Sequence, residues 1–257
     1  MSWYARLFWT SWKFHVKSLT ASMFFVLISV LQPVIFATIA FFMHEAGARG
    51  GSLLYVALGA GLMGMWSSTL FGSGGAIQWQ RWQGTLELLV GAPPRFIITL
   101  LPLTLATASI GLYSVVATLV WGRLLFGVPL DLEHPLLFAV ALPATTVALG
   151  LLGLVLASTF VLYRHASAFS NLLEYPVWLV SGLLVPVALL PGWVEPLSWV
   201  LAPTWGVRAV RESALGGEPL QAIAMCLALS AVYLVLGAVA MANFERLARS
   251  RATLALT

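Results

Sequence analysis

Long apolar runs, separated by short polar breaks, dominate the chain. A helix needs about 20 predominantly apolar residues to cross a membrane, and six segments of the sequence reach that length. They are residues 19–43, 53–76, 97–121, 135–162, 172–190 and 220–242. The pattern therefore predicts an all-α membrane protein with six transmembrane helices in a single domain over residues 1–257.

The first residues follow a different pattern. Polar and basic positions recur at helical spacing and form one stripe, and large apolar side chains cover much of the remaining surface. The stripe contains Arg6, Thr10, Lys13 and Lys17, and the apolar positions are Trp3, Leu7, Phe8, Trp12 and Phe14. A helix of this kind lies in the membrane interface. We therefore expect an amphipathic helix over residues 1–18, either as a membrane anchor or as a helix beside a gate.

The stretch before the last predicted span is too apolar for a loop in water and too rich in proline for a span. Short helices that dip into the outer leaflet would satisfy their own backbone hydrogen bonds there. We expect such re-entrant helices over residues 191–218, and Trp193, Trp199 and Trp205 fit an interfacial belt of aromatic residues.

Charge supports the membrane interpretation and gives it an orientation. Hydrophobic residues make up 60% of the chain and charged residues only 9%, whereas soluble domains carry about 25% charged residues. With the N-terminus inside, nine Lys and Arg residues fall in inner segments and four in outer segments. The positive-inside rule then predicts that both termini are cytoplasmic. The same bias accounts for the net charge of +4, so no nucleic-acid partner is expected.

The search for catalytic chemistry yields little. The phosphate-binding pattern G-x-x-x-x-G-K-[ST] is absent, and the four histidines lack the spacing of a metal site. The glycine-rich Gly72-Ser73-Gly74-Gly75 lacks the lysine, and we interpret it as a site of close helix packing. From these observations we expect a chain that is not an enzyme, with no metal and no cofactor of its own.

Ionisable residues within the predicted spans are scarce, and Glu174 is the candidate. It is expected at the cytoplasmic end of the fifth span, either in a cytoplasmic contact or in a substrate entrance. The residues of that possible path are Asn171, Glu174, Tyr175 and Ser181. An ion-coupled transporter needs charges inside the membrane, so their scarcity indicates that energy comes from another protein.

The connection after the second predicted span is the candidate contact with that protein. It reads QWQRWQGTLELLVGAPPRF over residues 78–96. Gly84 and Thr85 can begin a short helix with Glu87 near its positive end, and Pro93 with Pro94 stops it. We expect a docking helix over residues 84–92.

Two stretches also show a family resemblance. Gln83-Gly84-Thr85-Leu86-Glu87-Leu88-Leu89 with Ala92-Pro93 is similar to a "GT-(I/L)-E-x-L … P" segment. The second stretch is similar to "SG … P … LP-x-W … NP-x-T … R", with Ala202 where asparagine is usual. Its residues are Ser181-Gly182, Pro186, Leu190-Pro191-Gly192-Trp193, Pro203-Thr204 and Arg211. In this order the segments resemble the ABC-2 permeases of bacterial ABC transporters, especially the drug-resistance, daunorubicin-exporter-like branch.

The resemblance implies an assembly and roles for residues. Two permease subunits, identical or paralogous, would pair above two ABC ATPase subunits, which would bind ATP and Mg²⁺ in place of this chain. The coupling contact would be Gly84, Thr85, Leu86, Glu87, Leu88 and Leu89. The outer gate would be Pro186, Pro191, Trp193, Pro203 and Trp205. The expected location is the bacterial or archaeal cytoplasmic (inner) membrane, in contact with its lipids.

The cargo is inferred from the spans, which offer aromatic residues and few charges. A hydrophobic or amphipathic substrate, such as a drug, an antibiotic or a lipid, fits best and would make the protein a multidrug-efflux type of exporter. Export of a polysaccharide or glycolipid is the close alternative. A membrane-embedded enzyme, or an accessory subunit without an ATPase, is the alternative from another class.

Overall fold

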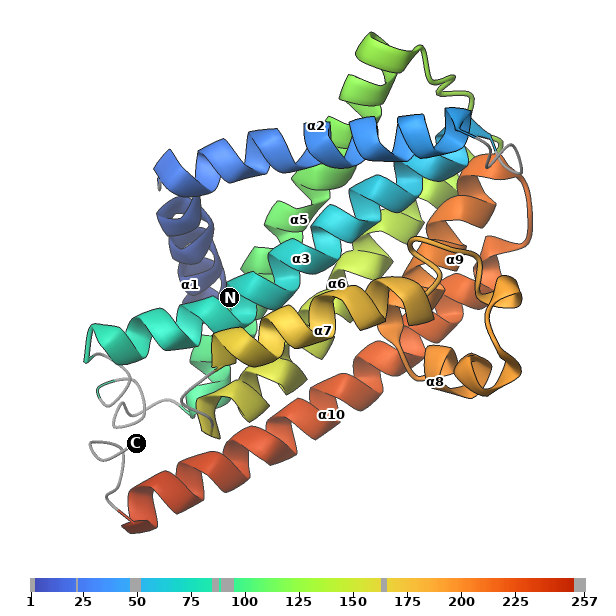
Figure 1. Cartoon of the computed structure of the whole chain (residues 1–257). Helices are drawn as coiled ribbons and strands as arrows, with labels where there is room; N and C mark the ends of the chain where they lie inside the picture. The colour runs from blue at the N-terminus through green and yellow to red at the C-terminus, as the bar shows by residue number, and fades with distance from the viewer. Residues whose placement is uncertain are drawn as a thin grey trace.

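The computed structural model describes residues 3–21, 23–46, 52–84, 88, 95–162 and 166–251, and this part of the chain contains helices and no strands. The all-α prediction is therefore confirmed. The elements are α1 (Trp3–Thr20), α2 (Met23–Glu45), α3 (Leu53–Trp82), α5 (Phe96–Phe126), α6 (Pro135–Leu162), α7 (Ala166–Val180), the 3-10 turns η1 (Val187–Leu189) and η2 (Gly192–Val194), α8 (Glu195–Trp199), α9 (Ala202–Leu215) and α10 (Pro219–Arg251) (Figure 1).

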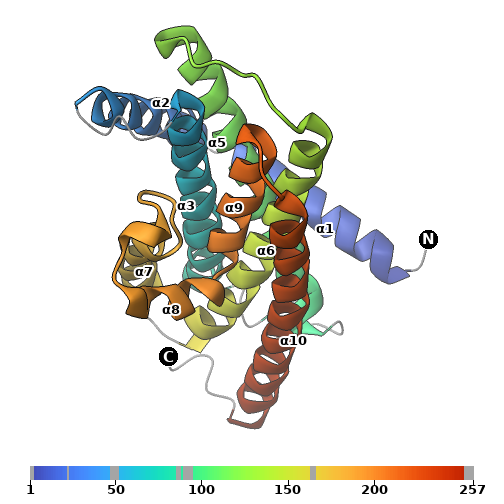
Figure 2. The same ribbon diagram turned by 90° about the vertical axis from the view of Figure 1, so that its right-hand side faces the viewer.

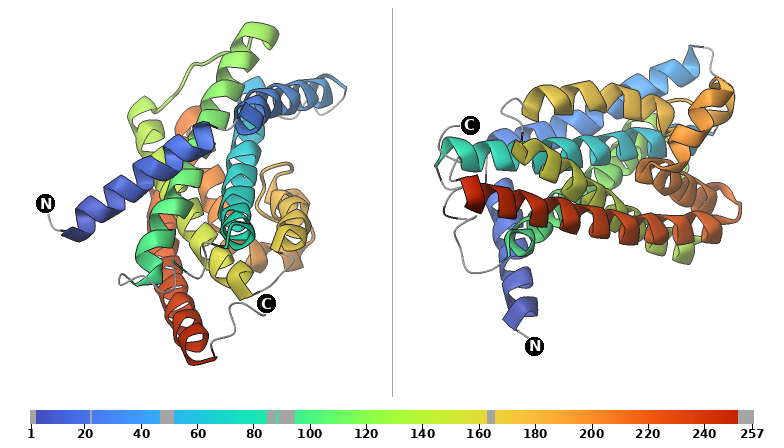
Figure 3. Two further views of the ribbon diagram at one scale, coloured as in Figure 1. Left: turned by 90° about the vertical axis from the view of Figure 1, so that its left-hand side faces the viewer. Right: turned by 90° about the horizontal axis from the view of Figure 1, so that it is seen from below.

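The long helices form an antiparallel bundle. Helices α2, α3, α5, α6, α7 and α10 alternate in direction along the chain (Figure 1). Helices α8 and α9 lie at one end of the bundle, which we call the α9 end (Figure 1). At the opposite end, the α1 end, α3 and α10 finish, α5 begins and α1 crosses the bundle (Figure 3). Figure 2 shows α9 at the centre of the α9 end of the bundle, close to α3, α6 and α10.

Four stretches of the described residues are long and apolar enough to cross a membrane. They are Leu53–Gly74, Phe96–Phe126, Pro135–Thr159 and Pro219–Arg246. In α2 the apolar stretch found among the described residues, Leu31–Glu45, is shorter than a span, and α7 has only 15 residues. The protein is thus a multi-pass membrane protein, and the count of six spans stays a prediction.

The helix bounds differ from the predicted ones most clearly at α7. Helix α6 covers 135–162 as expected, whereas α3, α5 and α10 run past their expected ends. The fifth span was expected over 172–190, and this is wrong for the second half, because α7 ends at Val180. Gly182 then adopts a φ of 80°, a left-handed conformation that glycine reaches without a steric penalty. Apolar residues after it form turns, so hydropathy alone extended the helix too far.

Glycines let the helices of the bundle approach closely. A Cβ on Gly61 of α3 would lie 2.8 Å from the Cα of Val115 in α5. A Cβ on Gly72 would lie 2.5 Å from Cγ2 of Thr107, also in α5. Small residues at such crossings let helices pack backbone to backbone in a membrane. Gly72 therefore packs closely, as its glycine-rich motif predicted.

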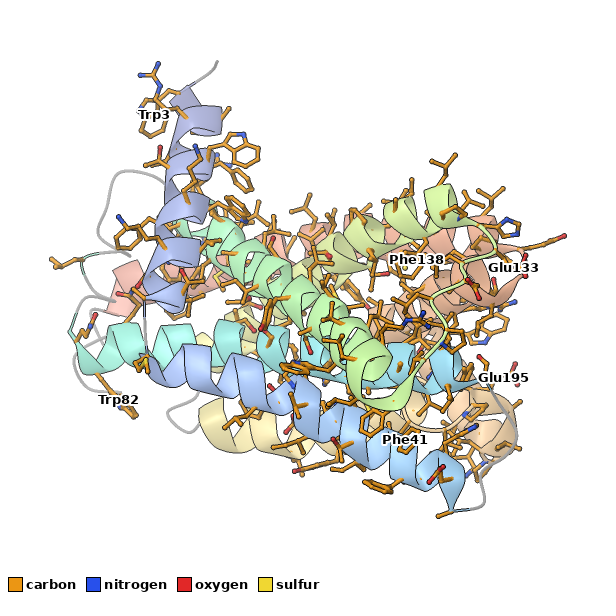
Figure 4. The ribbon with its side chains drawn as sticks, turned by 90° about the horizontal axis from the view of Figure 1, so that it is seen from above. Trp3, Phe41, Trp82, Glu133, Phe138 and Glu195 are labelled. Atoms are coloured by element: carbon orange, nitrogen blue, oxygen red, sulfur yellow. The ribbon has the colours of Figure 1, made fainter. Side chains whose placement is uncertain are left out.

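Two features mark the α1 end. The polar stripe of α1 is exposed at Arg6, Thr10, Lys13 and Lys17, and Trp3 lies at the end of α1 that projects away from the bundle (Figure 4). Glu245 of α10 accepts a hydrogen bond from the backbone N–H of Phe96, at 3.3 Å, and so satisfies a free donor at the start of α5. The position of α1 in the membrane interface stays a prediction.

Candidate functional site

The expected coupling residues lie largely outside the described residues. Thr85, Leu86, Glu87 and Leu89 fall there, as does the rest of 84–92 apart from Gly84 and Leu88. Gly84 has a φ of 67°, and the side chain of Leu88 is 73% exposed. Helix α3 continues through residues 78–82, so the polar connection begins later than expected. It leaves the bundle at the α1 end, where Trp82 closes α3 (Figure 4).

Glu174 is buried between α7 and α3. Its Oε1 accepts a hydrogen bond of 2.5 Å from the hydroxyl of Ser67, which also donates to the carbonyl of Met63. Ser67 lies well inside the apolar stretch Leu53–Gly74 of α3, and Glu174 lies in the interior of α7. Glu174 therefore lies inside α7 and contacts α3, and its place at the cytoplasmic end of the fifth span stays a prediction. Burial beside a single hydroxyl was not visible from the local sequence.

Tyr175 and Ser181, the other residues of the expected path with described side chains, do not join Glu174. Tyr175 is 62% exposed and therefore lies on another face of α7. Ser181 is buried near the α9 end and donates to the carbonyl of Val177, at 2.5 Å. Asn171 belongs to α7, and its side chain lies outside the described residues. The three described side chains thus do not line one opening.

Helix α9 is held at its start by a residue that the sequence did not single out. The hydroxyl of Tyr233 in α10 donates to the carbonyl of Val200 and accepts from the backbone N–H of Ala202 at 3.2 Å. Ala202 and Pro203 open the helix and are buried. Tyr233 therefore satisfies one of the backbone N–H groups that are left without an intrahelical partner at the start of α9.

Arg211 joins three parts of the bundle through one guanidinium group. Its Nη1 donates to the carbonyl of Gly182 at 2.7 Å and to the hydroxyl of Tyr55 at 3.0 Å. Its Nη2 donates to the carbonyl of Leu183 at 3.0 Å, and its Cζ lies 3.7 Å from the centre of the Tyr55 ring. A Cβ on Gly59 would lie 2.5 Å from Nη2, so glycine at this position makes room for the group. Arg211 thereby connects α9 to α3 and to the turn after α7.

Beside Arg211 lies a pocket of about 630 Å³, which we call the α9 pocket. It falls in the size range of about 300–1,000 Å³ that is typical of small-molecule sites. Its walls come from α3, the turns after α7, α8 and α9. They are Tyr55, Ser181, Gly182, Pro186, Val187, Ala188, Leu190, Gly192, Glu195, Ser198, Trp199, Thr204, Trp205, Val207, Arg208, Arg211 and Glu212.

The five expected gate residues separate into three groups around this pocket. Pro186 and Trp205 line it, Pro203 is buried in the start of α9, and Pro191 and Trp193 are exposed. Trp205 is only 5% exposed, and its Nε1 donates to the carbonyl of Trp199 at 2.8 Å. The expectation that Trp205 belongs to an interfacial aromatic belt is therefore wrong, whereas Trp193 and Trp199 are on the surface.

A comparison with protein families decides what kind of membrane protein this is. The model of the family described as ABC-2 type transporter matches residues 6–215, from α1 to the last residue of α9. The chain belongs to the ABC-2 type transporter family. It is therefore the membrane subunit of an ABC transporter, a permease that associates with an ABC ATPase subunit. A search of curated proteins finds no match.

The matched region of this ABC-2 permease contains the candidate sites. It includes the residues of the α3–α5 connection, Glu174 and the whole wall of the α9 pocket. It ends before α10, which supplies both Tyr233 and Glu245. The candidate sites therefore lie within the matched region. Tyr233 and Glu245, which form hydrogen bonds with the starts of α9 and α5, lie beyond it.

Proposed function

We propose that this chain is the permease subunit of an ATP-driven exporter that moves a hydrophobic or amphipathic substrate, such as a drug, an antibiotic or a lipid, out of the cell. The observation that carries the proposal is family membership in a bundle whose polar connection and α9 segment lie at opposite ends. The polar connection would bind the ATPase, and the α9 segment would control the exit of the substrate. The drug-resistance, daunorubicin-exporter-like branch is the subfamily that this function suits.

The orientation follows from the distribution of charge. Exposed Lys13, Lys17, Arg95 and Arg246 belong to α1, to the residue before α5 and to the far part of α10, all at the α1 end. Because cytoplasmic segments carry an excess of Lys and Arg, the α1 end faces the cytoplasm. The α9 end then faces outward, and both termini are cytoplasmic in the bacterial or archaeal inner membrane.

The coupling contact is residues 84–89, seated in a cleft of the ATPase subunit. Leu88 supports this role, because an apolar side chain that is 73% exposed is free to contact a partner protein. Two permease subunits, identical or paralogous, would share two ATPase subunits. ATP and Mg²⁺ would bind to the ATPase subunits, and the permease itself would provide the path of the substrate across the membrane.

The test is to copurify the permease with an ATPase encoded beside it and to measure ATP-dependent transport in inside-out vesicles. An exporter accumulates an amphipathic fluorescent dye in such vesicles, whereas a glycan exporter accumulates a labelled glycolipid instead. Transport of neither, or dye accumulation that does not require ATP, would contradict the proposal.

A matched pair of variants tests the coupling contact. We expect Leu88→Ala to weaken copurification of the ATPase and to lower substrate-stimulated hydrolysis at least fivefold, since buried contacts at an interface centre are worth about 1 kcal/mol or more. Leu136→Ala is the control, because Leu136 is 83% exposed at the start of α6, at the opposite end of the bundle, and does not line the α9 pocket. Equal ATPase binding by both variants would show that residues 84–89 do not form the contact.

A further inference from the structure

Arg211 is a buried cation without an acidic partner among the described residues. The side chain is 7% exposed, and its hydrogen bonds go to two carbonyls and a phenol, which are neutral. The other arginine of the pocket wall, Arg208, is paired with Glu212 at 2.7 Å. A buried charge that is not balanced by an opposite charge is costly in a medium of low dielectric constant. Arg211 therefore has no ion pair among the described residues, although the carboxylate of Glu195 also lines the α9 pocket.

Two donors in this wall are also left without partners. Nε of Arg211 is buried and has no hydrogen-bond partner among the described residues, and the same is true of Oγ1 of Thr204. Thr204, Arg208 and Arg211 follow one another at i, i+4 and i+7, so all three occur on one face of α9 and line the pocket. An unsatisfied buried polar group costs free energy that a ligand in the pocket can recover. A guanidinium and a hydroxyl in this arrangement suit an anionic group with several acceptor oxygens.

The segments that line the pocket also carry exposed apolar side chains, and we call this group of residues the rim. Leu189, Trp193, Leu197 and Val200 follow or flank the lining residues, and each is more than half exposed. Large apolar side chains gathered at a membrane surface favour contact with hydrocarbon or with the apolar part of a ligand. The ligand that fits both features has an anionic head and an apolar tail.

We propose that the α9 pocket binds an anionic amphiphile, with a phosphate or carboxylate headgroup at Arg211 and Thr204 and an apolar tail along the rim. Three of the five N–H donors of Arg211 are used inside the protein, so two remain for the headgroup, one of them on Nε. The inference concerns binding, and it holds whether the amphiphile is the transported cargo or a lipid of the membrane. Failure of the transport assay would leave it standing.

The test measures binding to the full-length permease in neutral detergent by native mass spectrometry. The probes are dioctanoyl-phosphatidylglycerol, dioctanoyl-phosphatidylcholine, which has the same chains and no net charge, and inorganic phosphate. We expect the phosphatidylglycerol to bind at least tenfold more tightly than either of the other two. Equal binding of the two lipids would overturn the anionic requirement, and phosphate that binds as tightly as phosphatidylglycerol would overturn the requirement for a tail.

Two variants assign the binding to this pocket. Thr204→Val removes a hydroxyl that makes no hydrogen bond within the described protein, so a purely structural role predicts no loss, whereas a headgroup contact predicts about fivefold weaker binding of phosphatidylglycerol. Arg211→Lys keeps the charge but loses the planar fork, and we expect about tenfold weaker binding.

Thr118→Val is the matched control. Thr118 lies in α5, and its buried Oγ1 likewise has no partner among the described residues, but it does not line the pocket. We expect its affinity to equal that of the unaltered protein. If Arg211→Lys fails to fold, the comparison of Thr204→Val with Thr118→Val still decides, because equal affinities in that pair would refute the site.

Discussion

Replacement of Gly206 by alanine tests how tightly α9 is packed on α6. A Cβ on Gly206 would lie 2.4 Å from Cγ2 of Thr145 and 3.2 Å from its Oγ1, whereas carbon atoms attract best at about 3.5–4.0 Å. Overpacking of this kind costs about 1–3 kcal/mol, and alanine offsets roughly 1 kcal/mol of that through its higher helix propensity. The clash prevails, and we expect Gly206→Ala to destabilise the protein by up to about 2 kcal/mol.

The assay is thermal unfolding of the detergent-purified protein, followed by intrinsic tryptophan fluorescence. A loss of 1 kcal/mol lowers the midpoint by about 2–4 °C in chains of about 150–250 residues. Gly192→Ala is the control, because a Cβ there meets no described atom within 4 Å. We expect its midpoint to remain within about 1 °C of the unaltered protein, since surface substitutions usually change stability by less than about 0.5 kcal/mol.

A second substitution shows whether the clash is the cause. Thr145→Ser removes the methyl group at 2.4 Å and retains a hydroxyl, the group that donates at 2.7 Å to the carbonyl of Ala141. In that background Gly206→Ala should become neutral or stabilising, with a coupling free energy of about 1–3 kcal/mol. If Gly206→Ala lowers the midpoint equally in both backgrounds, the cost does not come from Thr145 and the reasoning is refuted.

Substitutions at two further residues, Tyr233 and Glu174, probe hydrogen bonds by the same unfolding assay. Tyr233→Phe should cost about 1–3 kcal/mol, because the carbonyl of Val200 and the N–H of Ala202 lose their common partner; an unchanged midpoint would show that other groups satisfy both. Glu174→Gln should leave the midpoint within about 3 °C of the unaltered protein, because the amide oxygen still accepts from Ser67. Glu174→Ala should lower it clearly further, since it leaves a cavity and an unpaired hydroxyl; equal midpoints for the two Glu174 variants would contradict this role.

The sequence predicts the elements of this fold wherever hydropathy and breakers agree. Helix α6 is uniformly apolar between polar flanks, and its bounds, 135–162, coincide with the expected ones. At α7 the two signals conflict, because an apolar run continues past Gly182, whose backbone conformation ends the helical path. Hydropathy measures how well a segment tolerates lipid and carries no information on where the backbone turns.

The candidate site is less accessible to sequence reasoning, because its contacts join distant residues. Arg211 belongs to a sequence motif, but its hydrogen-bond partners are two backbone carbonyls and a tyrosine that lies 156 residues away in the chain. Tyr233 sits in an apolar helix where nothing marks its hydroxyl as a cap for α9. Such contacts depend on which helices become neighbours, and periodicity along one segment does not determine that.

The hydrogen bond between Glu245 and the start of α5 connects the last helix to the α1 end of the bundle. The N–H of Phe96 is the first donor after the connection that begins at the end of α3. Under the proposed coupling role, a movement of that connection would therefore reach α10 as well as α5. Because α10 also holds the start of α9 through Tyr233, it forms a continuous rod between the two ends of the molecule. Helix α10 is therefore placed to connect the two ends of the bundle as well as to span the membrane.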